Sequence, residues 1–228
     1  MDRIIPMRTP SKEECFKLMW ETGMLPNIVA HSLQVCLVAD FLANHLEKHG
    51  IDLDCDLVQT SALLHDITKT RSLTTGEFHA LTGAEFVRRI GYPDVAYIVG
   101  HHVILDENNV SDKPFCEAEI VNYADKRVLH DRVVSLQERM DYILDKYAKH
   151  PGDRERIARN WLMAKDLERK VFGFLPFSPD DLNGLSGSDN LSAAIMEYHA
   201  FCSRFLVQTS HASISFDEIP SIRVNSPK

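Results

Sequence analysis

Apolar side chains recur along most of the chain at intervals of three and four residues, which places them on one face of a helix. The first such segment starts with a capping box formed by Ser11 and Glu14 and ends at Gly23. The two-residue alternation of a strand is nowhere strong enough to indicate a sheet, and the sequence shows no internal repeat. The pattern predicts an all-α fold.

A second, longer helix is predicted between a cap at Asn27 and a stop at Gly50. Its apolar positions cover most of the circumference, so we expect it to be deeply buried. Six further helices are predicted over residues 56–68, 77–90, 93–102, 117–151, 154–171 and 191–208. Small and polar residues enrich the segments 71–76, 106–114 and 176–190, which are predicted to be loops.

The length of 228 residues indicates one large domain, alone or with an appendage. We assign residues 1–175 to this domain, as a helical bundle. Residues 176–228 are interpreted as a linker, a last amphipathic helix and a polar tail that pack on the same domain. Beyond Thr209 the chain loses its periodicity, and we expect it to be poorly ordered or to lie along the surface.

The composition is that of a soluble globular protein, with 44% hydrophobic and 25% charged residues. A net charge of -8 argues against general nucleic-acid binding, which needs a basic face, but leaves room for a local phosphate pocket. Five scattered cysteines form no disulfide framework and fit a reducing compartment. Without a signal peptide or a stretch approaching ~18 apolar residues, the protein is predicted to be cytoplasmic and free of the membrane.

Histidine carries the clearest chemical signal, because the chain has eleven and several lie in apolar contexts. His65 and Asp66 are adjacent at the end of the apolar run that begins at Ser61. Neighbouring side chains on a helix point about 100° apart, so packing alone does not require this pair. An imidazole and a carboxylate together suit zinc, manganese or iron, which makes His65 and Asp66 candidate metal ligands.

Two further residues are candidates for the same ion. His31 lies in the helix that is otherwise committed to the core, and Asp125 interrupts the buried-looking run from Ile120. A carboxylate at such a position is costly unless it is paired or metal-bound. With His65 and Asp66, these residues would leave coordination positions open for water and substrate, as a catalytic metal site requires.

Three other histidines are candidates for a second ion, with Asp66 as the bridge between the two. His79 starts the predicted helix after the loop, and His101 and His102 end the next one. Ile98 is predicted to be buried, and His101 lies three residues after it, so His101 is the preferred ligand. His102 is the alternative.

Simpler interpretations exist for each candidate taken alone. His31 could be an ordinary hydrogen-bonded core histidine, and His79, His101 or His102 could lie on the surface near helix ends. Asp125 with its basic neighbours could be a solvated charge run. The other histidines are interpreted as having no site role: His45, His49, His130, His150, His199 and His211.

The order His, His-Asp, His, His, Asp resembles the HD-domain superfamily of metal-dependent phosphohydrolases. The similarity runs from about Asn27 to Arg132. It rests on the fragments Ala62–Lys69, His79–Glu85, Ile98–His102 and Tyr123–Asp125. The sequence is most similar to the subgroup with a His-Asp-Ile-Gly signature and two extra histidines, and departs from it at Thr68. The resemblance implies an all-α HD-domain bundle with two divalent ions, such as manganese, iron or another transition metal, with magnesium as an alternative.

The predicted activity is hydrolysis of a phosphoester by a metal-activated water, with Asp66 and Lys69 as catalytic residues. Lys69 lies one helical turn after the His-Asp pair, where its ammonium can bind a substrate phosphate, and Arg132 is a second candidate. The resemblance favours a nucleotide or similar small phosphorylated substrate. Open alternatives are a di-iron oxygenase with the same ligands and a non-catalytic sensor or scaffold. The segment after Val133 either closes the cleft or forms a homodimer contact.

Overall fold

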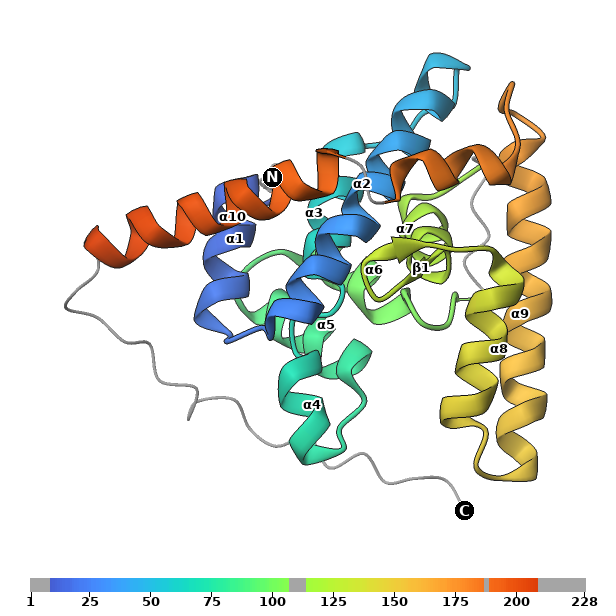
Figure 1. The fold of residues 1–228 in the computed structure, drawn as a ribbon, viewed down its shortest axis with the longest axis horizontal. Coiled ribbons are helices and arrows are strands. Elements are labelled where there is room, and N and C mark those ends of the chain that lie inside the picture. Colours follow the sequence, from blue (N-terminus) through green and yellow to red (C-terminus); the bar gives the residue numbers. More distant parts are fainter. Residues whose placement is uncertain (1–8, 107–113, 187–188, 209–228) are drawn as a thin grey trace, which may run out of the picture.

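The computed structural model describes residues 9–106, 114–186 and 189–208. The regular elements in these ranges are helices apart from one short hairpin, and the all-α class is confirmed (Figure 1). The elements are α1 Lys12–Glu21, α2 Pro26–Lys48, α3 Cys55–Leu64, α4 Lys69–Thr75, α5 His79–Arg89, α6 Pro93–His101, α7 Glu117–Lys126, β1 Val128–Leu129, β2 Arg132–Val133, α8 Leu136–Tyr147, α9 Pro151–Phe172, the 3₁₀ helix η1 Pro179–Leu185 and α10 Asp189–Gln208.

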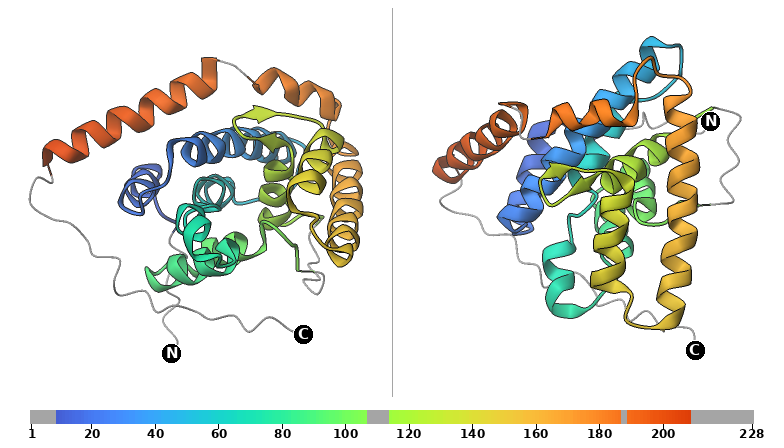
Figure 2. Two further views of the ribbon diagram at one scale, coloured as in Figure 1. Left: turned by 60° about the horizontal axis from the view of Figure 1, so that its bottom comes forward. Right: turned by 45° about the vertical axis from the view of Figure 1, so that its right-hand side comes forward.

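The long helix α2 forms the centre of the bundle, with α3 and α7 packed against it. α5 and α6 pair with each other, and α6 closes the core against α3 and α7. α8 and α9 form an antiparallel pair on one side of the bundle, and α10 lies across α1 and α2 (Figures 1 and 2). The consecutive helices α2 and α3 and the distant helix α7 therefore meet around one part of the core.

The first two helices begin as local sequence rules dictate, with one correction. Glu14 donates its backbone N–H to Oγ of Ser11, and its carboxylate accepts the Ser11 N–H, so the predicted capping box is confirmed. α2 begins at Pro26, whose fixed φ and missing N–H suit the first position of a helix. The prediction that Asn27 caps this helix was wrong, because Asn27 lies in its first turn and Leu25 is the N-cap.

α2 is also long and apolar enough to cross a membrane, so the expectation that no stretch approaches a span needs correction. However, 67% of its most apolar window is buried inside the protein, as in the central helix of a globular core. Its buried side chains meet those of α3 and α7, and this packing accounts for its hydrophobicity.

The third helix ends earlier than its pattern predicts. α3 stops at Leu64, residues 65–68 form turns, and α4 occupies the segment that was predicted to be a loop. Thr68 contributes to this break, because its hydroxyl donates to the carbonyl oxygen of His79 at 2.9 Å and contacts the Thr82 hydroxyl. The turn brings His65 and Asp66 to the end of α3 rather than its flank.

The helix predicted over residues 117–151 is interrupted. α7 ends at Lys126, a hairpin of β1 and β2 follows, and α8 starts after the N-cap Ser135. Arg127 explains the break, since its buried guanidinium donates to the carbonyl oxygens of Val134 at 2.7 Å and Pro179 at 3.0 Å. These are tertiary contacts that a helical period cannot reveal. His130, with φ of 58°, makes the tight turn of the hairpin.

Residues 179–186 and 189–208 pack against the rest of the bundle. η1 lies against α2 and β2, and the Ser186 hydroxyl accepts the N–H of Val133 at 3.2 Å. Tyr198 of α10 contacts Phe16 of α1 edge to face, with ring centroids 5.3 Å apart. The predicted polar tail from Thr209 lies outside the described residues, and the division at residue 175 remains a prediction.

Candidate metal centre

His65 and Asp66 lie together at the end of α3, fully removed from water. Their exposed fractions are 0% and 1%. His65 donates from Nδ1 to the carbonyl oxygen of Ala62 at 2.7 Å, which leaves the lone pair on Nε2. Neither His65 Nε2 nor Asp66 Oδ1 has a hydrogen-bond partner in the described part of the chain. Buried acceptors of this kind are costly unless something positive meets them.

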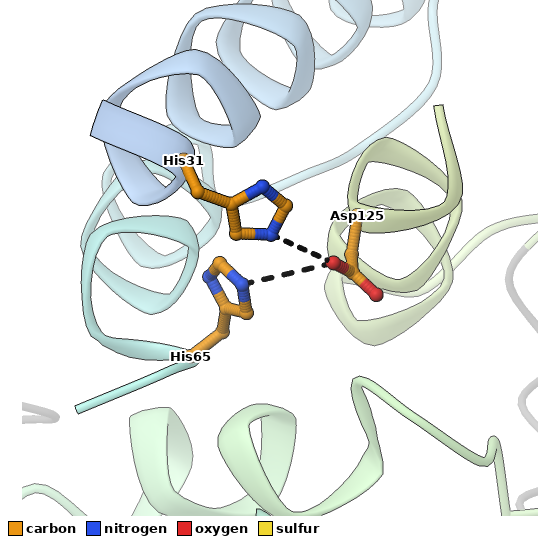
Figure 3. Close-up of side chains that lie close together, drawn as sticks. All are labelled: His31, His65 and Asp125. Atoms are coloured by element: carbon orange, nitrogen blue, oxygen red, sulfur yellow. Dashed lines mark hydrogen bonds and ion pairs between the residues drawn. The ribbon is translucent and has the colours of Figure 1, made fainter. Parts of the chain in front are cut away.

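Asp125 of α7 and His31 of α2 meet His65 at this point (Figure 3). Oδ1 of Asp125 lies 3.1 Å from Nε2 of His31 and 3.8 Å from Nε2 of His65. Oδ2 of Asp66 lies 3.5 Å from Nε2 of His65 and 3.9 Å from Nε2 of His31. We call these four residues the first group. The structure brings together all four ligands that the sequence proposed for one ion.

The hydrogen bonds of His31 favour a cation within the first group. Its Nδ1 lies 2.8 Å from the carbonyl oxygen of His130, which can only accept, so the proton is on Nδ1. In the neutral ring, Nε2 then carries a lone pair that faces the Asp125 carboxylate. Burial lowers the pKa of His31 although Asp125 opposes this, so the neutral form is favoured. A metal ion between the nitrogen and the oxygen would resolve this conflict.

The other oxygen of Asp66 faces two further histidines. Oδ1 lies 3.2 Å from Nε2 of His79 and 3.6 Å from Nε2 of His102, and the two nitrogens are 3.2 Å apart. We call Asp66, His79 and His102 the second group. Oδ2 of Asp66 thus faces the histidines of the first group, and Oδ1 faces those of the second, so the two groups share this carboxylate.

The preference for His101 over His102 is corrected by the structure. The ring of His101 packs on Tyr97, with centroids 4.4 Å apart, and its Nδ1 donates to the carbonyl oxygen of Tyr97. His102 is the C-cap of α6, is 1% exposed and donates from Nδ1 to the carbonyl oxygen of Val99. The buried face of α6 is defined by Val99 as well as Ile98, and counting from Val99 selects His102.

The donors of both groups fit divalent metal ions. Two ligands bound at ~2.1 Å lie about 3.0 Å apart at octahedral angles and about 3.4 Å apart at tetrahedral ones. The nitrogen–oxygen separations around Asp66 and Asp125 run from 3.1 to 3.9 Å. The two shortest lie between the octahedral and tetrahedral values: Asp125 to His31 at 3.1 Å and Asp66 to His79 at 3.2 Å. Imidazole nitrogens combined with carboxylate oxygens suit zinc, manganese and iron. Divalent cations held here would give the orphaned atoms of His65 and Asp66 their missing partners.

Two cationic side chains lie beside these groups. Nζ of Lys69 is 2.9 Å from Oδ2 of Asp66, and a guanidinium nitrogen of Arg139 is 3.7 Å from Oδ1 of Asp125. Burial alone would raise the pKa of Asp66, but Lys69 and His65 hold it well below its usual value. Arg139 is on α8 and its Nε has no hydrogen-bond partner among the described residues.

Arg139 is the site residue that the sequence reasoning missed, and Arg132 is the one it misplaced. Arg132 lies in β2, its side chain is 62% exposed, and its recorded ion pair is with Glu138 at 3.8 Å. Counting along one helix from Asp125 favoured Arg132, but the hairpin interrupts that helix. Arg139, in the first turn of α8, reaches the centre instead. Its proximity to Asp125 depends on the hairpin, so the sequence held no direct signal for it.

The simpler interpretation of Asp125 as part of a solvated charge run does not fit the structure. Lys126 is 7% exposed and Arg127 is 1% exposed, and both are hydrogen-bonded to backbone carbonyls. Asp125 itself is close to His31 and His65 in the interior. This stretch of charges is thus part of the core.

Comparison with known families agrees with this geometry. A family model of the HD domain matches residues 28–148, which include every residue of both groups. The chain belongs to the HD-domain family. Membership of this family implies divalent metal binding and suggests metal-dependent phosphohydrolase activity.

The relatives of this HD-domain protein differ in size and in name. An uncharacterised protein of Methanocaldococcus jannaschii is 28% identical over 61% of this chain and 86% of its own length. A ribonuclease Y of Aquifex aeolicus is 26% identical over 71% of this chain, which spans 32% of that enzyme. A tRNA (cytidine(56)-2'-O)-methyltransferase of Thermoplasma volcanium is 29% identical over 66% of this chain and 45% of its length. No solved structure matches the chain.

Thr68 is where this HD-domain protein departs from the His-Asp-Ile-Gly signature. Its hydroxyl bonds to the carbonyl oxygen of His79 and to Thr82, at 2.9 Å each. A glycine could make neither contact. Thr68 therefore ties the turn that carries Asp66 to the start of α5, where His79 lies, and the departure removes no candidate ligand.

Proposed function

We propose that this protein is a metal-dependent phosphohydrolase that cleaves a phosphoester of a nucleotide or similar small phosphorylated substrate. The observation that carries the proposal is the position of Asp66, whose two carboxylate oxygens face two separate groups of histidines. Lys69 and Arg139 lie beside the same carboxylates. Metal ligands together with two cations suit a substrate that carries a phosphate.

Bound divalent ions would supply a water nucleophile at neutral pH and neutralise charge on the phosphoryl oxygens. The protein's own contribution begins with the three histidines whose Nδ1 atoms donate to backbone carbonyls: His31, His65 and His102. These bonds fix the tautomer and the ring orientation, so each Nε2 faces the centre.

Lys69 is placed to bind and orient the substrate phosphate. Its side chain is 29% exposed, whereas Asp66 beside it is 1% exposed, so the ammonium lies between the buried carboxylate and solvent. Asp66 raises the pKa of Lys69 against the effect of burial, which keeps the ammonium charged. With its carboxylate partner held by ions, the Lys69 ammonium would be free to bind a phosphoryl oxygen.

Arg139 is the second phosphate-binding candidate, and it also reaches an aromatic ring. Its guanidinium lies 6.0 Å from the ring of Tyr142, one turn further along α8. Lys146 approaches the same ring, with Nζ 2.8 Å from the Tyr142 hydroxyl. A ring flanked by two cations can stack with a base while the cations bind phosphates. This arrangement supports a nucleotide among phosphorylated substrates.

Metal content and phosphate release test this proposal together. The purified protein, reconstituted with manganese or iron, should release phosphate from a panel of nucleotides and phosphomonoesters, and a strong chelator should abolish the release. Full activity in the chelator would contradict the proposal. Oxygen consumption with iron and no phosphate release would favour the oxygenase alternative, whereas absence of both metal and turnover would favour the sensor alternative.

A further inference from the structure

The carbonyl groups at the C-terminal end of α6 are bound by two side chains of α7. Asn122 donates from Nδ2 to the carbonyl oxygen of His102 at 2.8 Å and to that of His101 at 3.3 Å. Lys126 donates from Nζ to the carbonyl oxygens of His102 and Val103, at 3.5 and 3.4 Å. The last carbonyl groups of a helix have no hydrogen-bond donor within the helix, and here Asn122 and Lys126 provide the donors.

Both donors act where water is excluded. Asn122 is 2% exposed and Lys126 is 7% exposed. A buried ammonium is costly unless its protons are bound. Here it lies at the negative end of the α6 dipole, where a cation is favourable. The two residues are four apart and so lie on the same face of α7, which makes them one clamp on one helix end.

The residue that this clamp holds is a member of the second group. The backbone of His102 accepts from both Asn122 and Lys126, and its ring donates from Nδ1 to the carbonyl oxygen of Val99. These contacts leave Nε2 of His102 facing Oδ1 of Asp66 at 3.6 Å.

The same helix supplies a ligand to the first group. Asp125 precedes Lys126 directly, and its Oδ1 lies 3.1 Å from Nε2 of His31 in the first group. α7 therefore contacts both groups, one through a carboxylate and the other through the end of α6.

We propose that Asn122 and Lys126 are positioning residues that hold His102 in the second group, so that α7 sets the placement of the second metal ion relative to the first. The inference rests on the proposed function, because it requires the second group to bind an ion. Loss of the clamp should loosen His102 and release the second ion, while Asp125 and the first group remain in place.

Manganese binding to the full chain tests the clamp without reference to activity. Equilibrium dialysis should show two Mn²⁺ ions in the wild type, and electron paramagnetic resonance should show the coupling of two ions that share the Asp66 carboxylate. Lys126→Met removes the ammonium, and Asn122→Asp replaces the donor with an acceptor of nearly the same shape. Each variant should lower the affinity for the second ion by about 10- to 100-fold, the usual effect of removing a group that orients a ligand.

At manganese concentrations that saturate the wild type, the variants should then give the spectrum of a single, uncoupled ion. Asn160→Ala is the matched control, because Asn160 lines the same small cavity as Lys126. It should retain both ions and their coupling. A general loss of stability would remove both ions together and would lower the midpoint of thermal unfolding, which is measured in parallel.

The outcomes separate this inference from the proposed function. Two coupled ions with wild-type affinity in both Lys126→Met and Asn122→Asp would overturn the clamp and leave the proposed function intact. One ion in the wild type would also overturn it, because the second group would then hold none. No bound ion in the wild type would contradict both proposals. Loss of both ions in a folded variant would show a structural role for α7 and would overturn the selective effect on His102.

Discussion

The ammonium of Lys69 lies 2.9 Å from Oδ2 of Asp66, an oxygen that also faces the two histidines of the first group. One carboxylate oxygen thus has a lysine on one side and imidazole nitrogens on the other. Because Lys69 is partly exposed and Asp66 is buried, the lysine is the part of this contact that a substrate can reach.

Replacing Lys69 with alanine should therefore impair substrate use more than metal binding. We expect kcat/KM to fall by about 10- to 150-fold, the equivalent of one hydrogen bond to a charged group. The bound metal, measured by elemental analysis, should not decrease. Arg132→Ala is the control, because this exposed arginine lies in the hairpin and should leave kcat/KM unchanged. Metal loss in Lys69→Ala would assign the lysine to the metal groups instead.

Arg139→Ala should show whether the second cation binds substrate as well. Its guanidinium is beside Asp125 and 12% exposed, so we expect a raised KM for phosphorylated substrates with metal content retained. Steady-state kinetics measures this, and the exposed arginine variant Arg156→Ala provides the comparison on the neighbouring helix. An unchanged KM would place the phosphate elsewhere.

Asp66→Asn should have the largest effect on the centre. The substitution keeps the shape of the side chain but removes the charge that both groups share, so we expect loss of both ions and of hydrolysis. Elemental analysis and phosphate release measure the two results. Asp54→Asn is a control, because Asp54 is the N-cap of α3 and lies at the opposite end of this helix from His65 and Asp66. Retention of one ion would show that Asp66 does not bridge.

The two adjacent histidines at the end of α6 should behave differently. His102→Ala should remove one of two ions, because His102 is the member of this pair whose Nε2 lies near Asp66. His101→Ala should retain both, since its ring packs on Tyr97. Metal stoichiometry after dialysis decides between them, and equal losses in the two variants would contradict this assignment.

Removing the metal should lower stability as well as activity. Ions that bind only the folded protein stabilise it by about 2.7 kcal/mol at a hundredfold excess over Kd. Without them, the buried acceptors of His65 and Asp66 have no partner in the described structure. Thermal unfolding with and without a chelator should show a lower midpoint in the chelator, and restoring manganese should reverse it. An unchanged midpoint would argue against a buried metal centre.

Local rules in the sequence were sufficient for much of the fold. The capping box at Ser11 and the helical spacing of apolar residues predicted the first helix and the all-α class correctly. These features depend on neighbours within four residues, so they can be read from the chain. The chemistry of His65 and Asp66 was also visible, because a buried-looking His-Asp pair has few purely structural explanations.

The remaining features depend on contacts between distant segments. The hairpin after α7 exists because Arg127 binds Val134 and Pro179, and this hairpin turns α8 so that Arg139, rather than Arg132, reaches Asp125. At the end of α6, His102 rather than His101 faces Asp66, because the ring of His101 packs on Tyr97. The residue pattern thus indicated the all-α class and the types of ligand. Which of two neighbouring side chains faces the centre followed from tertiary packing, since helix ends are set by partners far along the chain.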